Sequence, residues 1–238
     1  MIRFQRPLKL LALLPRGNRL WKKAILTGTD TNAGKTWATI ALMRYFKRQG
    51  KTVVGMKPVA AGCFNQDGQL KNEDALLIQE NASLHIDYNL LNPYAYQLPV
   101  SPHIAGINNP VNLLTLVERF TVLKEMAEIV LVEGAGGWYA PVNDHEDISD
   151  LAKALALPVI LVVAIKLGCI NHAKLTYWAI QQSGIPCAGW IAVCVDPDML
   201  KLDENIGTIK TALDVPMLGV LPYQATANFD LLASRLVL

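Results

Sequence analysis

The stretch Gly28-Thr29-Asp30-Thr31-Asn32-Ala33-Gly34-Lys35-Thr36 decides the fold of this 238-residue chain. It follows an apolar, β-branched run, Ala24–Thr29, and opens a segment of helical period, Lys35–Gln49. Two glycines, with five residues between them, let the backbone come close to a ligand. In a strand-loop-helix setting this pattern predicts N–H groups that cradle phosphates, with Lys35 reaching the terminal phosphates and the Thr36 hydroxyl facing Mg²⁺.

Further apolar runs read as strands of the same sheet as Ala24–Thr29. They are Thr52–Lys57, Glu128–Glu133, Val159–Ile165, Trp190–Val195 and Leu218–Leu221. Val159–Ile165 is apolar at every position, as expected of a strand buried on both faces. These runs alternate with segments of helical period, which is typical of βα units. The sequence therefore predicts an α/β fold: a single domain with a mostly parallel sheet flanked by helices on both faces, which is the P-loop NTPase fold.

Two of the helical segments are amphipathic. Lys35–Gln49 gathers apolar residues on one face, and Leu113–Ala127 does the same with Asn112 as its expected N-cap. Residues 58–110 are rich in proline and have no long periodic segment. We expect long loops there, and such loops suit a lid over a substrate.

Composition and charge exclude several classes of protein. Hydrophobic residues make up 52% and charged residues 18%, which excludes a disordered chain. The longest apolar run, Leu155–Ile165, contains Pro158 and is too short to span a membrane. Five of the 22 basic residues precede residue 20, so 17 remain against 20 acidic residues, a net charge of −3. We therefore expect neither a nucleic-acid partner nor a membrane.

The N-terminus and the cysteines bear on domain limits and compartment. Residues 1–23 are Arg-rich and acid-free, and we expect a disordered extension, or alternatively a targeting segment, ahead of a single domain at 24–238. The four cysteines, Cys63, Cys169, Cys187 and Cys194, have no CxxC spacing. They indicate reduced thiols and a cytoplasmic protein.

Three charged residues gain meaning beside the phosphate loop. Lys57 ends the strand Thr52–Lys57, and strand C-terminal ends in open α/β sheets face the ligand crevice. Glu133 ends another strand and suits a Mg²⁺ ligand, while Asp74 heads a predicted helix, Asp74–Gln79. Taken singly, Lys57 is interpreted as a solvated strand end, Glu133 as a loop carboxylate and Asp74 as a charge at a helix N-terminus. Together with the loop, they predict a phosphoryl-transfer site.

The segment from Gly168 to His172 precedes a predicted helix, Ala173–Gln182. A helix N-terminus can receive an anion such as a substrate carboxylate. The alternative is a plain capping turn with Asn171 as the cap. His172 and His103 are interpreted as structural or surface residues rather than general bases.

From Ala24 to Tyr223 the chain resembles the dethiobiotin synthetase family. The family's short motifs occur in order: Gly-Thr-Asp-Thr before Gly-Lys-Thr, Lys57-Pro-Val, Asn72 with Asp74, Ser101-Pro-His, Glu133-Gly-Ala-Gly-Gly-Trp and Leu167-Gly-Cys-Ile-Asn-His. Several short motifs in register are a specific signal. The resemblance implies a homodimeric enzyme that uses ATP and Mg²⁺ to close a cyclic urea from 7,8-diaminononanoate and CO₂ in biotin synthesis.

The resemblance also implies which residues form the site. Lys57 and Lys35 are the catalytic lysines, and Thr36, Asp74 and Glu133 are the metal ligands. Ala61, Cys169, Ile170 and Asn171 meet the diamine substrate, the last three across the dimer. ATP is expected at Gly28, Thr31, Asn32, Ala33, Gly34, Lys35, Thr36, Trp37, Asp74, Glu133, Gly134, Ala135, Gly136, Val193, Cys194, Pro222, Tyr223 and Gln224.

Three positions depart from the family's pattern. Asn32 stands where a Glu is common, Ala61 replaces a serine that meets the substrate, and Val193-Cys194 replaces an Asn-Asp pair that reads adenine. Loss of that amide is expected to relax the choice of nucleotide base, with the loop at Tyr223 compensating by packing.

A second class of protein shares the phosphate loop. A nucleotide-switch or partition-type ATPase uses the same loop to drive dimer association and acts through a protein partner. Such a switch hydrolyses ATP without a diamine, whereas a synthetase couples hydrolysis to the diamine and bicarbonate.

Overall fold

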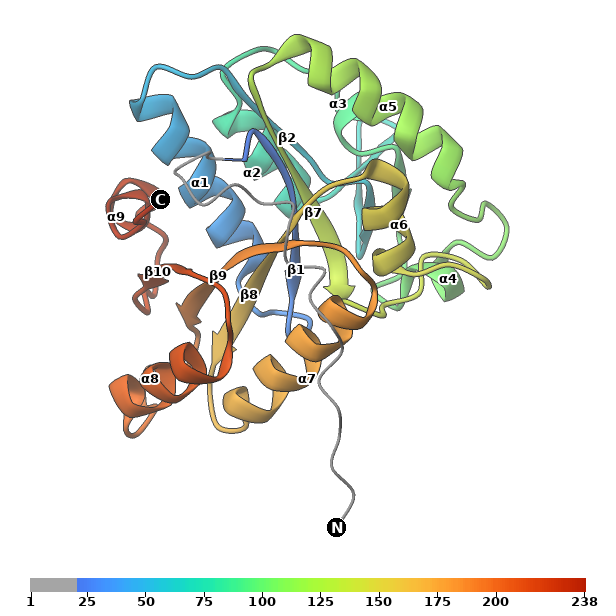
Figure 1. The fold of residues 1–238 in the computed structure, drawn as a ribbon. Coiled ribbons are helices and arrows are strands. Elements are labelled where there is room, and N and C mark those ends of the chain that lie inside the picture. The colour runs from blue at the N-terminus through green and yellow to red at the C-terminus, as the bar shows by residue number, and fades with distance from the viewer. Residues whose placement is uncertain (1–20) are drawn as a thin grey trace.

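A parallel sheet forms the centre of the computed structural model, which describes residues 21–238 (Figure 1). Within these residues the strand order is β10-β9-β8-β1-β7-β2 and every pairing is parallel. The strands are β1 Lys23–Gly28, β2 Val53–Met56, β7 Ile129–Gly137, β8 Val159–Ile165, β9 Cys187–Cys194 and β10 Met217–Leu221. All six predicted strands are confirmed, as is the fold class.

Burial explains why these runs lack polar alternation. Every residue of β8 is buried, and so is every residue of β2. Helices cover both faces of a parallel sheet, so both sides of each strand face apolar side chains. The phosphate loop leaves β1, which lies between β7 and β8 in the middle of the sheet.

Most of the helices lie in the crossovers between strands, and these crossovers run in two directions, whereas the last helix follows the last strand. The helices are α1 Lys35–Arg48, α2 Glu73–Asn81, α3 Tyr88–Leu91, α4 Pro102–Ala105, α5 Leu113–Met126, α6 Ile148–Leu155, α7 Cys169–Gln182, α8 Leu202–Ala212 and α9 Phe229–Ser234. From β1 the chain moves to β2 at one edge, and from β7 it moves back through β8 to β10 at the other. Right-handed crossovers in opposite directions place helices on both faces, and α9 packs along α1 (Figure 1).

Residues 58–110 are more ordered than the sequence predicts. Two small sheets form there, one pairing β3 (Val59–Ala61) in parallel with β6 (Tyr94–Tyr96) and one pairing β4 (Phe64–Gln66) with β5 (Gln69–Lys71) in a hairpin. Helices α2, α3 and α4 lie in the same segment. The prediction of long loops is therefore wrong in part, because strands of three residues give too little period to recognise.

Helix starts correct two predictions and confirm another. Asn112 caps α5 by accepting from the N–H groups of Leu114 and Thr115, as predicted. Asn171 is not a cap: α7 begins at Cys169, and Gly168 caps it in the left-handed conformation, with φ 91°. The helix that carries Asp74 begins one residue earlier, at Glu73.

The predicted N-terminal extension, residues 1–23, lies outside the described residues except for its last three. Trp21 packs edge-on against Phe46 of α1, with ring centroids 5.6 Å apart. Lys23, the last residue of the predicted extension, belongs to β1.

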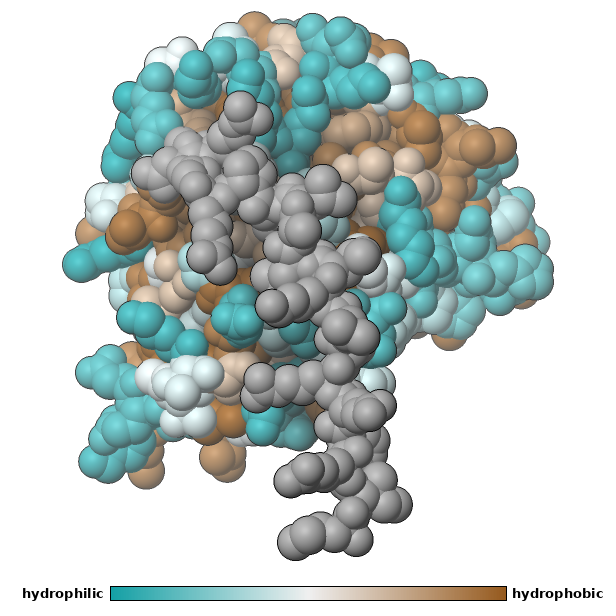
Figure 2. Space-filling view, viewed as in Figure 1, coloured by the Kyte–Doolittle hydropathy of each residue, from teal (hydrophilic) through white to brown (hydrophobic). Residues whose placement is uncertain are grey.

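The surface carries scattered apolar residues. Figure 2 shows them, in brown, over the upper right of one face. Helix α5 contributes three exposed apolar side chains, Leu114, Val122 and Met126. Within residues 21–238, no helix has both the length and the apolar character needed to traverse a bilayer.

Candidate active site

The loop between β1 and α1 has the backbone shape of a phosphate cradle. Asn32 and Gly34 adopt positive φ angles of 58° and 82°, a region that asparagine tolerates and glycine favours. Gly34 is the N-cap of α1, and no side chain within residues 21–238 caps that helix. Its first-turn N–H groups are therefore available to an anion. The Lys35 ammonium turns back and donates to the Asp30 carbonyl at 3.0 Å.

The loop packs directly against the end of β9. A Cβ atom added to Gly34 would lie 2.6 Å from Cγ1 of Val193. Only a residue without a side chain fits at this contact, because real Cβ atoms do not approach so closely. Val193 thus holds the loop at one side of the crevice.

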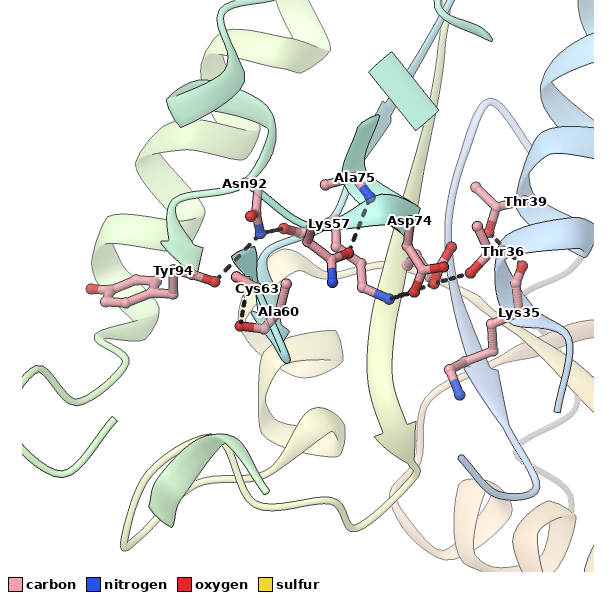
Figure 3. A network of polar contacts seen from close by, with 12 residues as sticks. Lys35, Thr36, Thr39, Lys57, Ala60, Cys63, Asp74, Ala75, Asn92 and Tyr94 are labelled. Carbon is pink, nitrogen blue, oxygen red and sulfur yellow. Dashed lines mark hydrogen bonds and ion pairs between the residues drawn. The ribbon is translucent and has the colours of Figure 1, made fainter. Parts of the chain in front are cut away.

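Four polar side chains converge beside the loop. The Lys57 ammonium lies 2.5 Å from Oε1 of Glu133 and 3.0 Å from Oδ2 of Asp74. The Thr36 hydroxyl donates to the same Glu133 oxygen at 2.9 Å. Figure 3 shows Lys57 reaching from the end of β2 toward Asp74 and Thr36. Glu133 is fully buried and Lys57 nearly so, whereas the Asp74 side chain is 42% exposed.

Burial and neighbouring charges set the protonation of this cluster. Burial alone would lower the pKa of Lys57, but the charges of Glu133 and Asp74 outweigh it and leave that pKa raised. Burial would raise the pKa of Asp74, yet the Lys57 charge reverses this and lowers it. Lys35 lacks a close carboxylate, so burial and then the charge of Lys57 lower its pKa to about 8.

The cluster has the donor set of a magnesium site. Oε2 of Glu133 is buried and has no hydrogen-bond partner within the described residues. An orphaned carboxylate oxygen beside a hydroxyl and a second carboxylate fits an ion that keeps several waters and takes one or two carboxylates. No group of three or more His, Cys, Asp or Glu residues forms a metal site among residues 21–238. The oxygens beside the loop that would suit Mg²⁺ are those of Thr36, Asp74 and Glu133.

A cavity of about 870 Å³ joins the loop to this cluster and extends beyond it. Most of the residues expected from the sequence line it. These are Thr31, Asn32, Gly34, Lys35, Thr36, Trp37, Lys57, Ala61, Asp74, Glu133, Ala135, Gly136, Val193, Cys194, Tyr223 and Gln224. The structure thus brings together segments that lie up to 193 positions apart in the sequence, from Thr31 to Gln224.

Seven expected residues lie within residues 21–238 but do not line the cavity: Gly28, Ala33, Gly134, Cys169, Ile170, Asn171 and Pro222. Gly28 underlies the loop, where an added Cβ would lie 3.1 Å from the Lys35 ammonium nitrogen. Cys169 is buried at the start of α7, and Asn171 is exposed in its first turn. The expected contact of this segment with substrate stays a prediction.

Some lining residues were absent from the set expected of the site. Asn72 and Ser101 are polar members, and Val59, Ala60, Leu77, Pro99, Val100, Pro102, Ala140 and Val195 also line the cavity. Asn72 caps α2, and an Asn ahead of Glu-Asp is a recognisable helix start. Ser101 precedes Pro102 at the first position of α4, which is a second such signal.

Comparison with known proteins identifies relatives over most of the chain. A family model described as an AAA domain matches residues 22–229. An ATP-dependent dethiobiotin synthetase BioD of Xanthomonas axonopodis pv. citri is 45% identical over 205 residues, which cover 85% of this chain and 92% of that protein. The chain belongs to the ATP-dependent dethiobiotin synthetase family.

Another dethiobiotin synthetase, from Nitrosospira multiformis, is 46% identical over 219 residues, covering 90% of this chain and 94% of its own length. A third, from Aromatoleum aromaticum, is 44% identical over 212 residues, with 88% and 93% covered. The similarity to these dethiobiotin synthetases therefore covers most of this chain and nearly the whole length of each relative.

Solved structures support the fold alone. The MinD cell division protein of Aquifex aeolicus has a TM-score of 0.54 at 15% identity and covers 90% of this chain and 87% of its own. The signal recognition particle receptor FtsY of Elizabethkingia anophelis has a TM-score of 0.53 at 15% identity, with 93% and 64% covered. The chain thus shares its fold with proteins of other names.

Proposed function

We propose that this chain forms dethiobiotin from 7,8-diaminononanoate and CO₂, with ATP converted to ADP and phosphate. One observation carries the proposal: the Lys57 ammonium lies between two carboxylates beside the phosphate loop, inside a single cavity of about 870 Å³. Such a cavity is large enough for a nucleotide and a small second substrate together. The membership of the dethiobiotin synthetase family supports the same reaction.

The phosphates of ATP belong at the loop. First-turn N–H groups of α1 and the Lys35 ammonium face the terminal phosphates in this arrangement. The base belongs between the end of β9 and the loop at Tyr223 and Gln224. The side chains of Val193 and Cys194 carry no amide that could read adenine, so we propose that the site also binds other nucleoside triphosphates.

Magnesium belongs at Thr36, Asp74 and Glu133, whose hydroxyl and carboxylates suit a hard cation. When bound, Mg²⁺ neutralises charge on the phosphates during transfer. The chain's own part is to hold these oxygens together. Lys57 does so before any substrate arrives, since its ammonium contacts both carboxylates.

The diamine belongs at the far end of the cavity, along Ala61 and the segment from Pro99 to Pro102. One amine captures CO₂ and loses a proton to give a carbamate. A carbamate oxygen then attacks the γ-phosphorus and ADP leaves. The second amine attacks the carbamate carbon and loses a proton, the C–O bond to phosphate breaks, and the ring closes. Lys35 and Lys57 offset the negative charge that each step moves, so no protein nucleophile is needed.

The active form is proposed to be a homodimer in the cytoplasm. The outer side of α7 exposes Leu175 and Trp178, and Leu167 just before it is 90% exposed. Exposed apolar groups of this size are typical of subunit contacts. A dimer through α7 would carry residues 169–171 toward the partner's substrate. All four cysteines, which lie within residues 21–238, are free thiols, as in a reducing compartment.

A partition-type ATPase remains the rival from another class, and only the shared fold favours it. The test is phosphate release from the purified chain with Mg-ATP, with and without 7,8-diaminononanoate and bicarbonate. We expect release that depends on the diamine and yields dethiobiotin. Release without the diamine would favour the rival. Repeating the assay with CTP and GTP ranks the bases.

A further inference from the structure

A chain of buried hydrogen bonds lies behind Lys57, on the side away from the cavity. The Asn92 amide donates to the Lys57 carbonyl at 2.6 Å (Figure 3). The Lys57 N–H in turn donates to the Leu91 carbonyl at 2.9 Å. Asn92 is 2% exposed. The last residue of α3, Leu91, and its C-cap, Asn92, therefore hold the backbone of Lys57 at both its N–H and its carbonyl.

A tyrosine hydroxyl continues the chain toward Asp74. The Tyr88 hydroxyl donates to Oδ1 of Asn92 at 3.1 Å and accepts from the Asn72 N–H at 2.8 Å. Asn72 caps α2 by accepting from the Ala75 N–H, and Asp74 lies between these two residues. One buried phenol thus joins the residue that holds Lys57 to the cap of the helix that carries Asp74.

We propose that Tyr88 is a positioning residue for the proposed reaction, because its hydroxyl sets the Lys57 ammonium relative to the Asp74 carboxylate. The inference rests on the proposed function for its catalytic consequence. It rests on geometry for its structural part. Removing the hydroxyl leaves two polar groups, the Asn72 N–H and the Asn92 Oδ1, without this partner. Because unpaired polar groups inside a protein are costly, we expect the backbone at Asn72 and Asn92 to shift.

The ring of Tyr88 has a separate role, which the test leaves intact. The Lys71 ammonium lies 3.6 Å from the ring centroid, and Tyr88 as a whole is only 6% exposed. Phenylalanine keeps the ring, its packing and the cation contact. Tyr88→Phe therefore removes the hydrogen bonds alone.

The chain offers a matched control. The Tyr94 hydroxyl also accepts from the N–H of a helix cap, Asn112 at the start of α5, at 3.1 Å. Tyr94 is 8% exposed, much like Tyr88, and its hydroxyl has no link to Lys57 among the described residues. Tyr94→Phe therefore reports the general cost of losing a buried cap-bound hydroxyl.

The experiment compares wild type, Tyr88→Phe, Tyr94→Phe, Lys57→Gln and the double variant of Tyr88 and Lys57. We expect Tyr88→Phe to lower kcat at least tenfold, with KM for the diamine and Kd for ATP within twofold of wild type and a Tm close to that of Tyr94→Phe. In the Lys57→Gln background the same change should cost nothing further, because Tyr88 acts through Lys57. An equal loss of kcat in Tyr94→Phe, or additive losses in the double variant, would overturn the proposal.

A second readout does not depend on turnover. Proton–nitrogen NMR of lysine side chains should give a slowly exchanging Lys57 ammonium signal, which Lys57→Gln removes and so assigns. We expect Tyr94→Phe to keep this signal and Tyr88→Phe to shift or broaden it. A signal unchanged in Tyr88→Phe, or missing from wild type, would overturn the positioning role. A wild type without diamine-dependent turnover would instead reject the proposed function, and the NMR result would still decide the role of Tyr88.

Discussion

Replacing Glu133 with glutamine should destabilise the protein more than any exposed charge change. Glu133 is fully buried, and its Oε1 accepts from both Thr36 and Lys57. Losing this charge leaves Lys57, whose side chain is 6% exposed, with Asp74 as its remaining carboxylate. Removing one partner of a buried ion pair costs about 3 to 5 kcal/mol, and we expect about 3 because Asp74 remains and the amide oxygen still accepts. For a chain of this size that lowers Tm by about 6 to 12 °C.

Urea or thermal unfolding without nucleotide measures this change, and Glu128→Gln is the control. Glu128 also pairs with a lysine, Lys51 at 2.9 Å, but both side chains are more than 40% exposed. Solvent screens such a pair, so the control should unfold almost as wild type does. The reasoning fails if Glu133→Gln unfolds within about 1 kcal/mol of wild type, since a buried lysine would then tolerate losing its nearest carboxylate.

Three other changes test the loop and the proposed dimer. The pKa of Lys35 is lowered to about 8, so between pH 8 and 10.5 the unfolded chain binds one proton more and the stability of the ATP-free protein rises with pH. ATP binding needs the Lys35 ammonium, so calorimetric titration should give a Kd for ATP that increases above pH 8. A Kd that stays constant with pH would contradict this. Gly34→Ala should lower the free energy of unfolding by about 2 kcal/mol or more and abolish ATP binding, because it adds backbone strain at φ 82° and a clash with Val193. Gly50→Ala, which has a similar φ and open space around it, is the control for strain alone. Equal unfolding free energies for the two variants would contradict the clash. Trp178→Glu should give monomers in sedimentation at unchanged Tm, and a persisting dimer would remove α7 from the interface.

The sheet could be predicted from the sequence because its signal is local. Val159–Ile165 is apolar throughout and became β8 with the same limits. The strand predicted to end at Glu133 instead runs on to Gly137, because Gly137 pairs with Gly28 of β1. Pairing between distant segments carries no local period, so the extension is invisible in the sequence. The same holds for β3 and β6, which pair across 35 positions from Val59 to Tyr94.

The residues of the candidate site likewise fall into two groups, those that local sequence predicts and those that only the fold brings together. The phosphate loop could be predicted because spacing and position suffice for it, and Lys57 because it ends a strand. The cap of α7 could not be predicted from the sequence, because Gly168 starts the helix through its left-handed backbone conformation and has no capping side chain. Tyr88 and Asn92 could not be foreseen, since nothing in their residue types points to Lys57. Only the fold brings them behind it.

The charges of the four ionised side chains beside the loop sum to zero. Lys35 and Lys57 carry two positive charges and Asp74 and Glu133 two negative charges, all around one cavity. At distances beyond a Debye length an approaching nucleotide therefore meets almost no field from this site. Electrostatic steering needs a surplus of one sign, so ATP should arrive at an ordinary diffusive rate that changes little with ionic strength. Affinity then resides in the rate of departure, which the loop controls once the phosphates are seated.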